Sequence, residues 1–538
     1  MSISSAPLKS QVKGRFQGVF QEPAVLQLFF LFSIGAAYAT LLLLEPHRNL
    51  WFDELLTYYI TKAPSWKQLF ELVYRFDLNP MPVDYVLRRL SIAIFGDNEI
   101  AVRAPSILAF YITSVMLFLY VRRKVGSGYA TLAVLVLWYS PLFRYATEAR
   151  PYALSCMFFS SLLLFCDIAS SAERPSSALL GVAASNLGLV NVHGFGLLSL
   201  LPFLVAEAWR FRTLRKPDYA LWAALLLPPL TFTLYLPLAR LHNPAIFPLK
   251  FQAALRKIPI FFLHVFQDMG SGMFVALLAA ILAPTIGFNR WIPADKKLTG
   301  IRIADGVIIV ILILNPILLI LALIPIHGAF WDRYCITTTM AIYVALVVCI
   351  ACRLRLNQLA GYTAALVLAC VLVTEHVVLP AVHRPAIRTA DVVAQIEPSL
   401  PLVTASGLTF VEMDHYESVN LVSRLYYLTG RSAAIQYAHA TLFEDLVPLQ
   451  EFKRYFPIRA NVEDYSRFTK LHREFLVLGT YDYPEDWLLR KLEADGARLV
   501  PIGFYDIPYK DHTVYKVVLP DSALKEPMNP DSAPGGLN

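Results

Sequence analysis

The chain has 538 residues, of which 57% are hydrophobic and only 16% are charged. Soluble globular domains carry about a quarter charged residues, so this composition excludes an ordinary soluble protein and indicates a polytopic membrane protein. The net charge is +7. The basic residues are separated by apolar runs and show no basic-aromatic groove pattern, so we expect no nucleic-acid partner. The six cysteines lie in or beside apolar runs, which favours buried packing residues over disulfides or a zinc site.

The apolar runs predict the topology. Residues 24–44 are long enough to cross a bilayer as a helix, and they follow a basic tail, residues 1–23, that we expect in the cytoplasm. The run should remain as an anchor, because it is longer than a signal peptide and lacks a cleavage pattern. Continuing in this way predicts about eleven transmembrane helices, with the N-terminus inside and the C-terminus outside. The later spans are expected over residues 105–121, 129–142, 151–168, 178–192, 195–209, 219–238, 273–288, 306–326, 334–351 and 359–379.

The first outer loop, residues 45–100, is unusually long and polar for a loop between membrane spans. Residues 66–74 and 85–95 are predicted to be short amphipathic helices in the interface plane. In the second of these, Arg88 and Arg89 lie opposite the apolar positions, so we expect both side chains on the polar face.

Two adjacent carboxylates, Asp53 and Glu54, follow the first membrane exit directly. An ordinary interpretation is that Asp53 caps a short helix and Glu54 lies in its first turn. The alternative is that the pair belongs to a functional site, since nothing in lipid requires a polar loop at this position.

Many other ionisable residues lie near the expected outer ends of the spans, in five or six separate loops. They are Asp53, Glu54, Asp77, Asp84, Arg103, Arg144, Glu148, Arg150, His193, Arg240, His327, Asp332 and Arg333. Charges at this depth usually line a water-filled or substrate-filled cavity. A carboxylate can take a proton from an attacking hydroxyl, and arginine can hold a phosphate through two parallel hydrogen bonds. The set therefore fits a lipid-phosphate substrate.

Composition changes after residue 380, and residues 381–520 are predicted to form an α/β domain outside the membrane. The tail, residues 521–538, has a disordered composition. Strands are expected over residues 401–405, 475–480, 498–504 and 514–519, and helices over residues 416–428, 444–456 and 486–495.

Several motifs resemble one family. They are Trp-Phe-Asp-Glu at 51–54, Phe-Gly-Asp-Asn-Glu at 95–99, Arg-Ala-Pro-Ser at 103–106, Glu-Ala-Arg-Pro-Tyr-Ala-Leu at 148–154 and Arg-Tyr at 333–334. Together they are similar to the GT-C glycosyltransferases, in the bacterial branch that includes relatives of protein O-mannosyltransferases and the lipid A aminoarabinose transferase. The resemblance spans residues 24–379. It implies a GT-C-like polytopic α-helical enzyme of the bacterial inner membrane that takes a sugar from a polyprenyl-phosphate carrier.

The resemblance also implies roles for particular residues. Asp53 is the expected general base, and Glu54 and Glu148 would orient the acceptor or bind a metal. Arg150 and Arg333 would hold the donor phosphate. The ordinary alternatives are a first-turn charge for Glu54, a salt bridge to a nearby arginine for Glu148, and snorkelling at a helix end for the two arginines.

Four further residues are weaker candidates. Tyr334 would assist donor binding, and Arg103, Tyr152 and His193 would contact substrate. The tyrosines are more often interface-belt aromatics, and a satisfied interfacial histidine is commoner than a ligand.

The chain departs from the family where relatives often carry His-Pro-Pro, because residues 79–82 read Asn-Pro-Met-Pro. This departure leaves the acceptor and metal dependence open. The sequence indicates no particular cofactor and leaves a divalent ion open, with Asp53 and Glu148 as its candidate ligands and without a recognisable ligand cluster.

The predicted reaction is a direct displacement that inverts the sugar, with a lipid, glycan or protein as the extracytoplasmic acceptor. A transporter or flippase of a lipid-linked sugar is one alternative, although the two related halves with broken helices that many transporters show are not evident. A cell-surface glycan polymerase or ligase would differ only in its acceptor. A scaffold whose outer domain binds a partner would not need the loop carboxylates.

Overall fold

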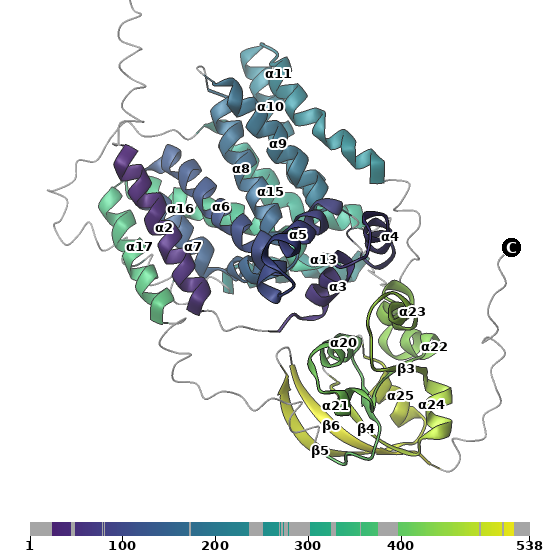
Figure 1. The fold of residues 1–538 in the computed structure, drawn as a ribbon. Helices are drawn as coiled ribbons and strands as arrows, with labels where there is room; N and C mark the ends of the chain where they lie inside the picture. The colour runs from purple at the N-terminus through teal and green to yellow at the C-terminus, as the bar shows by residue number, and fades with distance from the viewer. Residues whose placement is uncertain are drawn as a thin grey trace, which may run out of the picture.

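The computed structural model describes residues 24–44, 49–235, 251–267, 302–323, 330–374 and 396–520, apart from residues 78, 80, 172–173, 356, 482, 484–485 and 508–509, together with residues 270, 273 and 278. A helical unit and a smaller α/β domain lie against each other (Figure 1). The predicted span over residues 273–288 falls almost wholly outside the described residues, as do residues 1–23 and 521–538.

The helical unit contains both long α-helices and short 3-10 segments (Figure 1). Its elements outside the first loop are α2 (Ala24–Leu44), α6 (Glu99–Val125), α7 (Ser127–Tyr139), η2 (Pro141–Thr147), α8 (Tyr152–Ala169), α9 (Ser176–Val192), α10 (Gly196–Leu214), α11 (Tyr219–Leu226), η3 (Pro228–Tyr235), α13 (Phe251–Gln267), α15 (Ile303–Leu323), η7 (Asp332–Cys335), α16 (Ile336–Arg353) and α17 (Gln358–Val373).

Within the described ranges, four helical segments are long and apolar enough to cross a membrane: α6, α8, α15 and η7 with α16. Shorter apolar helices accompany them. The chain is therefore a multi-pass membrane protein, while the count of about eleven spans and their orientation stay predictions. Two details differ from expectation. The span predicted over 219–238 changes to a 3-10 segment after Leu226, where Pro228 and Pro229 cannot continue the backbone ladder. The loop expected over 239–270 contains α13.

Charged residues tie one end of the bundle together. The last turn of α6 carries a basic run, in which Lys124 is buried and pairs with Asp167 at 2.6 Å and Asp305 at 2.7 Å. Arg103 lies at the other end of the same helix, roughly 31 Å away along the axis by helical rise. The charged residues at the two ends of α6 therefore belong to separate sites.

The cysteine prediction holds only in part. Cys156 and Cys335 are buried, whereas Cys349, Cys352 and Cys370 are exposed on their helices. All six thiols are free. Apolar helix positions that face outwards accommodate a small polarizable side chain as readily as core positions.

The first loop folds into three helices, α3 (Phe52–Thr61), α4 (Trp66–Phe76) and α5 (Pro82–Phe95). The expected amphipathic helices correspond to α4 and α5. One expectation about α5 is wrong, because Arg88 is fully buried instead of facing water. Asp84, one helical turn earlier, forms an ion pair with Arg88, and this pair offsets the cost of burying the guanidinium. Apolar residues of α5 such as Ile94 and Phe95 are exposed instead.

The C-terminal domain is a six-stranded sheet in the order β3-β2-β1-β4-β6-β5. The first four of these strands are parallel, and β6 and β5 pair antiparallel at one edge. The strands are β1 (Leu402–Thr404), β2 (Leu425–Thr429), β3 (Asn461–Asp464), β4 (Glu474–Gly479), β5 (Arg498–Ile507) and β6 (Lys510–Val518). The helical elements are α20 (Gly407–Tyr416), α21 (Val419–Val422), α22 (Arg431–Ala433), η9 (Ala434–Ala438), η10 (Leu442–Leu446), α23 (Leu449–Tyr455), α24 (Tyr465–Leu471) and α25 (Leu488–Ala494).

Alternate residues of the central strands face two different cores. Leu402 and Leu476 pack on one side of the sheet, and Val403 and Val477 pack on the other with α24 and α25. The helix expected over residues 416–428 is wrong. The second half of that segment is strand β2, which pairs with β1 through Leu402 and Leu425.

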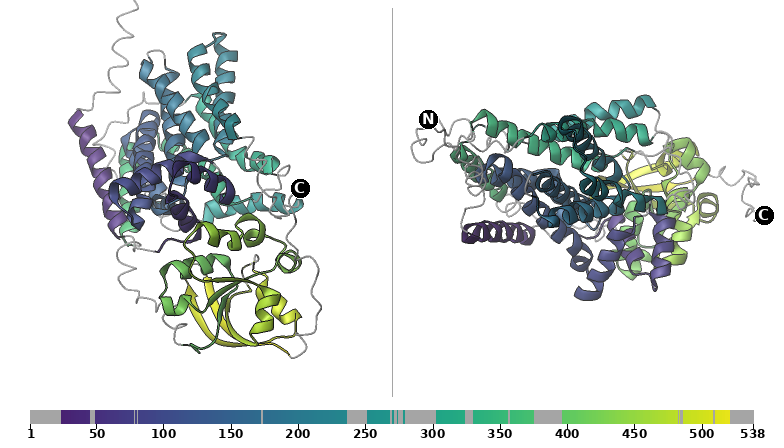
Figure 2. Two further views of the ribbon diagram at one scale, coloured as in Figure 1. Left: turned by 45° about the vertical axis from the view of Figure 1, so that its right-hand side comes forward. Right: turned by 90° about the horizontal axis from the view of Figure 1, so that it is seen from above.

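The domain shares a core with the first loop. Phe52, Leu55 and Tyr59 of α3 and Phe76 of α4 pack with residues of α20, α23 and the sheet. Figure 2 shows the domain beside these first-loop helices in both views. The α/β domain is therefore part of the scaffold that positions α3.

Candidate active site

The two adjacent carboxylates, Asp53 and Glu54, lie in the first turn of α3. Trp51 is the N-cap of this helix, so the interpretation of Asp53 as the capping residue is wrong. Glu54, at the third helical position, accepts a hydrogen bond from the Trp51 backbone N–H at 3.3 Å. Because consecutive helical residues point about 100° apart, Asp53 and Glu54 face different surroundings.

Glu54 is fully buried and its carboxylate is well supplied with donors. The Arg103 guanidinium donates to both of its oxygens, at 2.9 and 2.8 Å, and the Ala149 N–H donates at 2.7 Å. This bidentate pair joins α3, α6 and the segment before α8. The geometry favours a positioning role for Glu54 and Arg103 over direct contact with substrate.

Asp53 lies between two arginines. Its Oδ2 atom is 3.9 Å from Arg150 Nε and 3.4 Å from Arg333 Nη1. The Asp53 side chain retains 16% exposure, so the carboxylate is not sealed in protein. The structure thus brings together Asp53 of the first loop, Arg150 of the segment before α8 and Arg333 of η7, directly before α16.

Arg150 is held firmly from several sides. Its Nη1 atom donates to Asp77 Oδ2 at 3.2 Å and to Thr57 Oγ1 at 3.1 Å. Asp77 also accepts the Tyr85 hydroxyl proton. Burial alone would lower the pKa of Arg150, but the carboxylates of Asp77 and Asp53 raise it well above its usual range. This guanidinium is permanently charged and largely committed to protein contacts.

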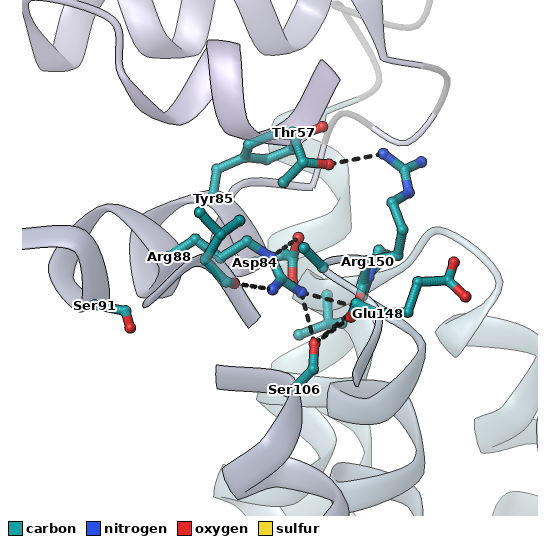
Figure 3. Close-up of polar contacts among 12 residues, drawn as sticks. Thr57, Asp84, Tyr85, Arg88, Ser91, Ser106, Glu148 and Arg150 are labelled. Atoms are coloured by element: carbon teal, nitrogen blue, oxygen red, sulfur yellow. Dashed lines mark hydrogen bonds and ion pairs between the residues drawn. The ribbon is translucent and has the colours of Figure 1, made fainter. Parts of the chain in front are cut away.

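Arg88 braces the segment that carries Arg150 (Figure 3). It donates twice to Asp84, at 2.9 and 2.6 Å, and to the Val102 carbonyl at 2.6 Å. It also donates to Ser106 Oγ at 3.0 Å and to the Arg150 carbonyl at 2.9 Å. This buried residue fixes the backbone at Arg150 without entering the site.

Glu148 is buried and carries an unusual pKa. Burial, followed by the nearby carboxylates of Glu54 and Asp53, raises the pKa of Glu148 to about 7. Neither Arg144 nor Arg150 comes within ion-pair distance of it among the residues that the structure places, so the expected salt bridge is not formed. Glu148 is therefore a carboxyl group that changes charge near neutral pH.

Arg333 has a different environment from Arg150. Its guanidinium is partly exposed and lies 5.4 Å from the Trp331 ring and 5.9 Å from the Tyr152 ring. Its Nε atom is buried without a hydrogen-bond partner in the described part of the chain. Arg333 therefore has hydrogen-bond donors that the described protein groups do not use and that can bind an anionic ligand.

His193, Tyr152 and Tyr334 form an aromatic wall next to Arg333. The His193 ring centroid lies 6.0 Å from that of Tyr152 and 5.6 Å from that of Tyr334. Its Nδ1 accepts the Phe195 backbone N–H at 3.3 Å. Burial, and then the Arg150 charge, lowers the pKa of His193 to about 4, so the ring is neutral at physiological pH. A satisfied packing histidine is the interpretation that fits.

Sequence reasoning missed the supporting residues. Asp77 and Asp84 were noted among loop charges without a role, and Thr57 and Tyr85 gave no signal. The i, i+4 spacing of Asp84 and Arg88 is the one signal that could have indicated a helical ion pair. Within the described ranges, no group of three or more His, Cys, Asp or Glu side chains is arranged to hold a metal ion.

Comparison with known proteins adds a family. Residues 79–235 match the family model of dolichyl-phosphate-mannose-protein mannosyltransferases. This match confirms the predicted resemblance, and the matched segment carries Arg88, Arg103, Glu148 and Arg150. No curated protein sequence matches the chain.

Two solved structures are similar at low identity. The crystal structure of ArnT from Cupriavidus metallidurans in the apo state has 14% identity and a TM-score of 0.48, covering 92% of this chain and 98% of that chain. The same protein bound to undecaprenyl phosphate has 15% identity and a TM-score of 0.45, with the same coverage.

Proposed function

We propose that this chain is a membrane glycosyltransferase that moves a sugar from a polyprenyl-phosphate donor to a hydroxyl group of an acceptor outside the cytoplasm. The observation that carries the proposal is the position of Asp53 Oδ2 between Arg150 and Arg333. A proton acceptor beside an anion-binding pair is the combination that transfer from a sugar phosphate needs. The family match over residues 79–235 supports the same class of donor.

The reaction is a single displacement. The acceptor oxygen attacks the anomeric carbon as the bond from that carbon to the phosphate oxygen breaks. The acceptor proton passes to Asp53, and the polyprenyl phosphate leaves with the bonding electrons. Because attack and departure occur on opposite faces, the anomeric centre inverts.

The two arginines have distinct parts in this reaction. The Arg333 side chain is 27% exposed whereas that of Arg150 is 9% exposed, so Arg333 is the better partner for the donor phosphate. Arg150 is already bound to Asp77 and Thr57 and contributes mainly fixed positive charge. A phosphate on Arg333 replaces the Asp53 carboxylate there and leaves that carboxylate free for the acceptor hydroxyl.

Glu148 supplies a second carboxyl group to the site. With a pKa of about 7 it is often protonated at neutral pH, and a protonated carboxyl can donate a hydrogen bond to acceptor or phosphate oxygens. Its tuned acidity suits proton exchange better than an ordinary surface glutamate.

The topology completes the proposal. We place the N-terminal tail in the cytoplasm and the α/β domain outside a bacterial inner membrane, because basic residues accumulate in the predicted inner loops. The donor phosphate and the surrounding membrane lipid then meet the site at the headgroup level.

The test is turnover by the purified full-length chain in nanodiscs with radiolabelled polyprenyl-phosphate sugars and candidate acceptors. Asp53→Asn should lower kcat by about 10²–10⁴-fold, the usual contribution of a general base. Asp332→Asn is the matched control, since this carboxylate is exposed and pairs with His264. Equal turnover by wild type and Asp53→Asn rejects the base, and movement of intact donor across the bilayer without bond cleavage identifies a transporter.

A further inference from the structure

A second cavity, about 320 Å³ in volume, lies between the first-loop helices and the α/β domain. Tyr58, Tyr59 and Lys62 of α3 line it from one side. These residues point about 140° to 240° around the helix from Asp53, so the cavity is on the opposite face of α3 from the candidate active site. It is a separate site that shares one rigid element with the first.

Aromatic rings form much of the wall. Tyr58 comes from α3, and Tyr455 and Phe456 come from the end of α23. Tyr455 is 41% exposed, so part of its surface is open to a ligand. Rings with open apolar surface and a few polar neighbours are the usual lining of small-molecule sites.

Polar groups in the cavity have donors and acceptors to spare. The Gln68 side-chain amide makes no hydrogen bond to another residue that the structure describes. Arg459 uses its Nη2 atom on backbone carbonyls of Asp414 and Glu417, which leaves Nε and Nη1 without protein partners in the same described part. An amide and a guanidinium edge can serve neighbouring hydroxyl groups on a ligand.

Asp414 lies beneath the cavity and is also incompletely satisfied. Its Oδ1 accepts the backbone N–H groups of Arg459 and Ala460 at 2.9 and 2.7 Å. Its Oδ2 is buried and has no partner in the described ranges. An unpartnered buried carboxylate oxygen is costly, and a hydroxyl that entered with a ligand would supply the missing donor.

The charge of the cavity is close to neutral. Lys62 is paired with Asp97 at 2.6 Å, and the Asp414 carboxylate interacts electrostatically with Arg459. Burial lowers the pKa of His415, so its ring adds no charge at neutral pH. The cavity therefore favours a neutral ligand rich in hydroxyl groups over a phosphate or a carboxylate.

From this geometry we infer that the cavity is a saccharide-binding site, with a pyranose ring packed against Tyr58 and Tyr455 and its hydroxyls bound by Gln68 and Arg459. The site goes beyond the proposed transfer reaction and does not depend on it. Asp53 and Lys62 lie roughly 13 Å apart along α3 by helical rise, so a bound saccharide lies close to the transfer site without occupying it.

The test is direct binding to the full-length chain in nanodiscs, measured by saturation-transfer NMR and calorimetry. The probes are methyl mannoside, methyl glucoside, methyl N-acetylglucosaminide, maltose and cellobiose, with inositol phosphate as the anionic comparison. We expect saturable binding of at least one neutral saccharide. Gln68→Ala and Tyr455→Ala should each weaken it at least tenfold.

Two controls separate this inference from loss of folding and from the proposed activity. Tyr481→Ala removes an exposed tyrosine of the same domain outside the cavity and should bind like wild type. Asp53→Asn should also bind like wild type even if it cannot turn over donor. If Tyr455→Ala melts early, Gln68→Ala decides, because the Gln68 side chain makes no hydrogen bond or ion pair with the described residues, and the hydrogen bond to Ser65 comes from the Gln68 backbone N–H. Absence of saturable saccharide binding, unchanged affinity in Gln68→Ala, or tighter binding of inositol phosphate overturns the inference.

Discussion

Replacing Arg88 with methionine tests the brace behind the candidate active site. The substitution keeps much of the side-chain volume but leaves the Asp84 carboxylate, which is 1% exposed, buried without its cation. Breaking a buried ion pair from one side costs about 3–5 kcal/mol. The Val102 carbonyl, Ser106 and the Arg150 carbonyl lose donors as well, at about 1 kcal/mol each before relaxation. Allowing for overlap, we expect about 5 kcal/mol.

The assay is thermal unfolding of the purified protein, with turnover measured in parallel. A loss of about 5 kcal/mol should lower the apparent melting temperature by roughly 5–10 °C for a cooperative unit of a few hundred residues. Turnover should fall further, because the Arg150 backbone loses a support. The matched control is Arg89→Met on the same helix, since Arg89 is less buried and donates only to the Thr61 and Ala63 carbonyls.

A second variant decides whether the ion pair is the cause. In the double variant Asp84→Asn with Arg88→Met, neither position of the pair carries a charge, so a large part of the lost stability should return. The reasoning is refuted if Arg88→Met melts like wild type, or if the double variant is no more stable than Arg88→Met alone.

Three further predictions concern the site and its support. Glu148 has a pKa of about 7 in the folded protein and an ordinary value of 4.5, so the folded protein binds this proton more tightly than the unfolded chain does. The stability gained in this way is fully present below pH 4.5 and is lost as the pH rises to about 7, by about 3 kcal/mol. Glu148→Gln should lack this loss in melting curves from pH 4.5 to 8, and parallel curves for both proteins would contradict the shifted pKa. Arg333→Lys keeps the positive charge but loses the planar guanidinium with its paired donors, so we expect about tenfold weaker binding of a polyprenyl phosphate. Arg144→Lys is the control. Equal affinity of wild type and Arg333→Lys would rule out the phosphate role. Glu412 accepts the Phe52 N–H at 3.1 Å, so Glu412→Ala should lower kcat several-fold with little change in donor binding. An unchanged kcat would show that the α/β domain does not position Asp53.

Much of the helical unit could be predicted because its signal is local. The helix over Ile303–Leu323 follows from an uninterrupted apolar run, and strands β1 and β4 follow from short β-branched and leucine-rich runs. Strand β2 was missed because its leucine and tyrosine residues also fit the end of an amphipathic helix. Pairing with β1, across more than twenty residues of sequence, decides the conformation.

The site could be predicted only as a set of charges. The sequence indicates that Asp53, Arg150 and Arg333 lie near membrane exits, but their distances depend on how three remote segments pack. The burial of Arg88 contradicts the amphipathic pattern, because a hydropathy pattern assigns every arginine to water and cannot see a partner such as Asp84. The assignment of Glu54 as catalytic failed to anticipate Arg103, which binds both of its oxygens.

The core shared by the first loop and the α/β domain has a consequence for biosynthesis. Phe52 leaves the ribosome 360 residues before Glu412, the side chain that binds its backbone N–H. During that interval the apolar residues of α3 that pack on the α/β domain lack this partner. Translation that stops before the α/β domain would yield a chain in which α3 keeps its ion pair with Arg103 but lacks the contacts with α20 and α23.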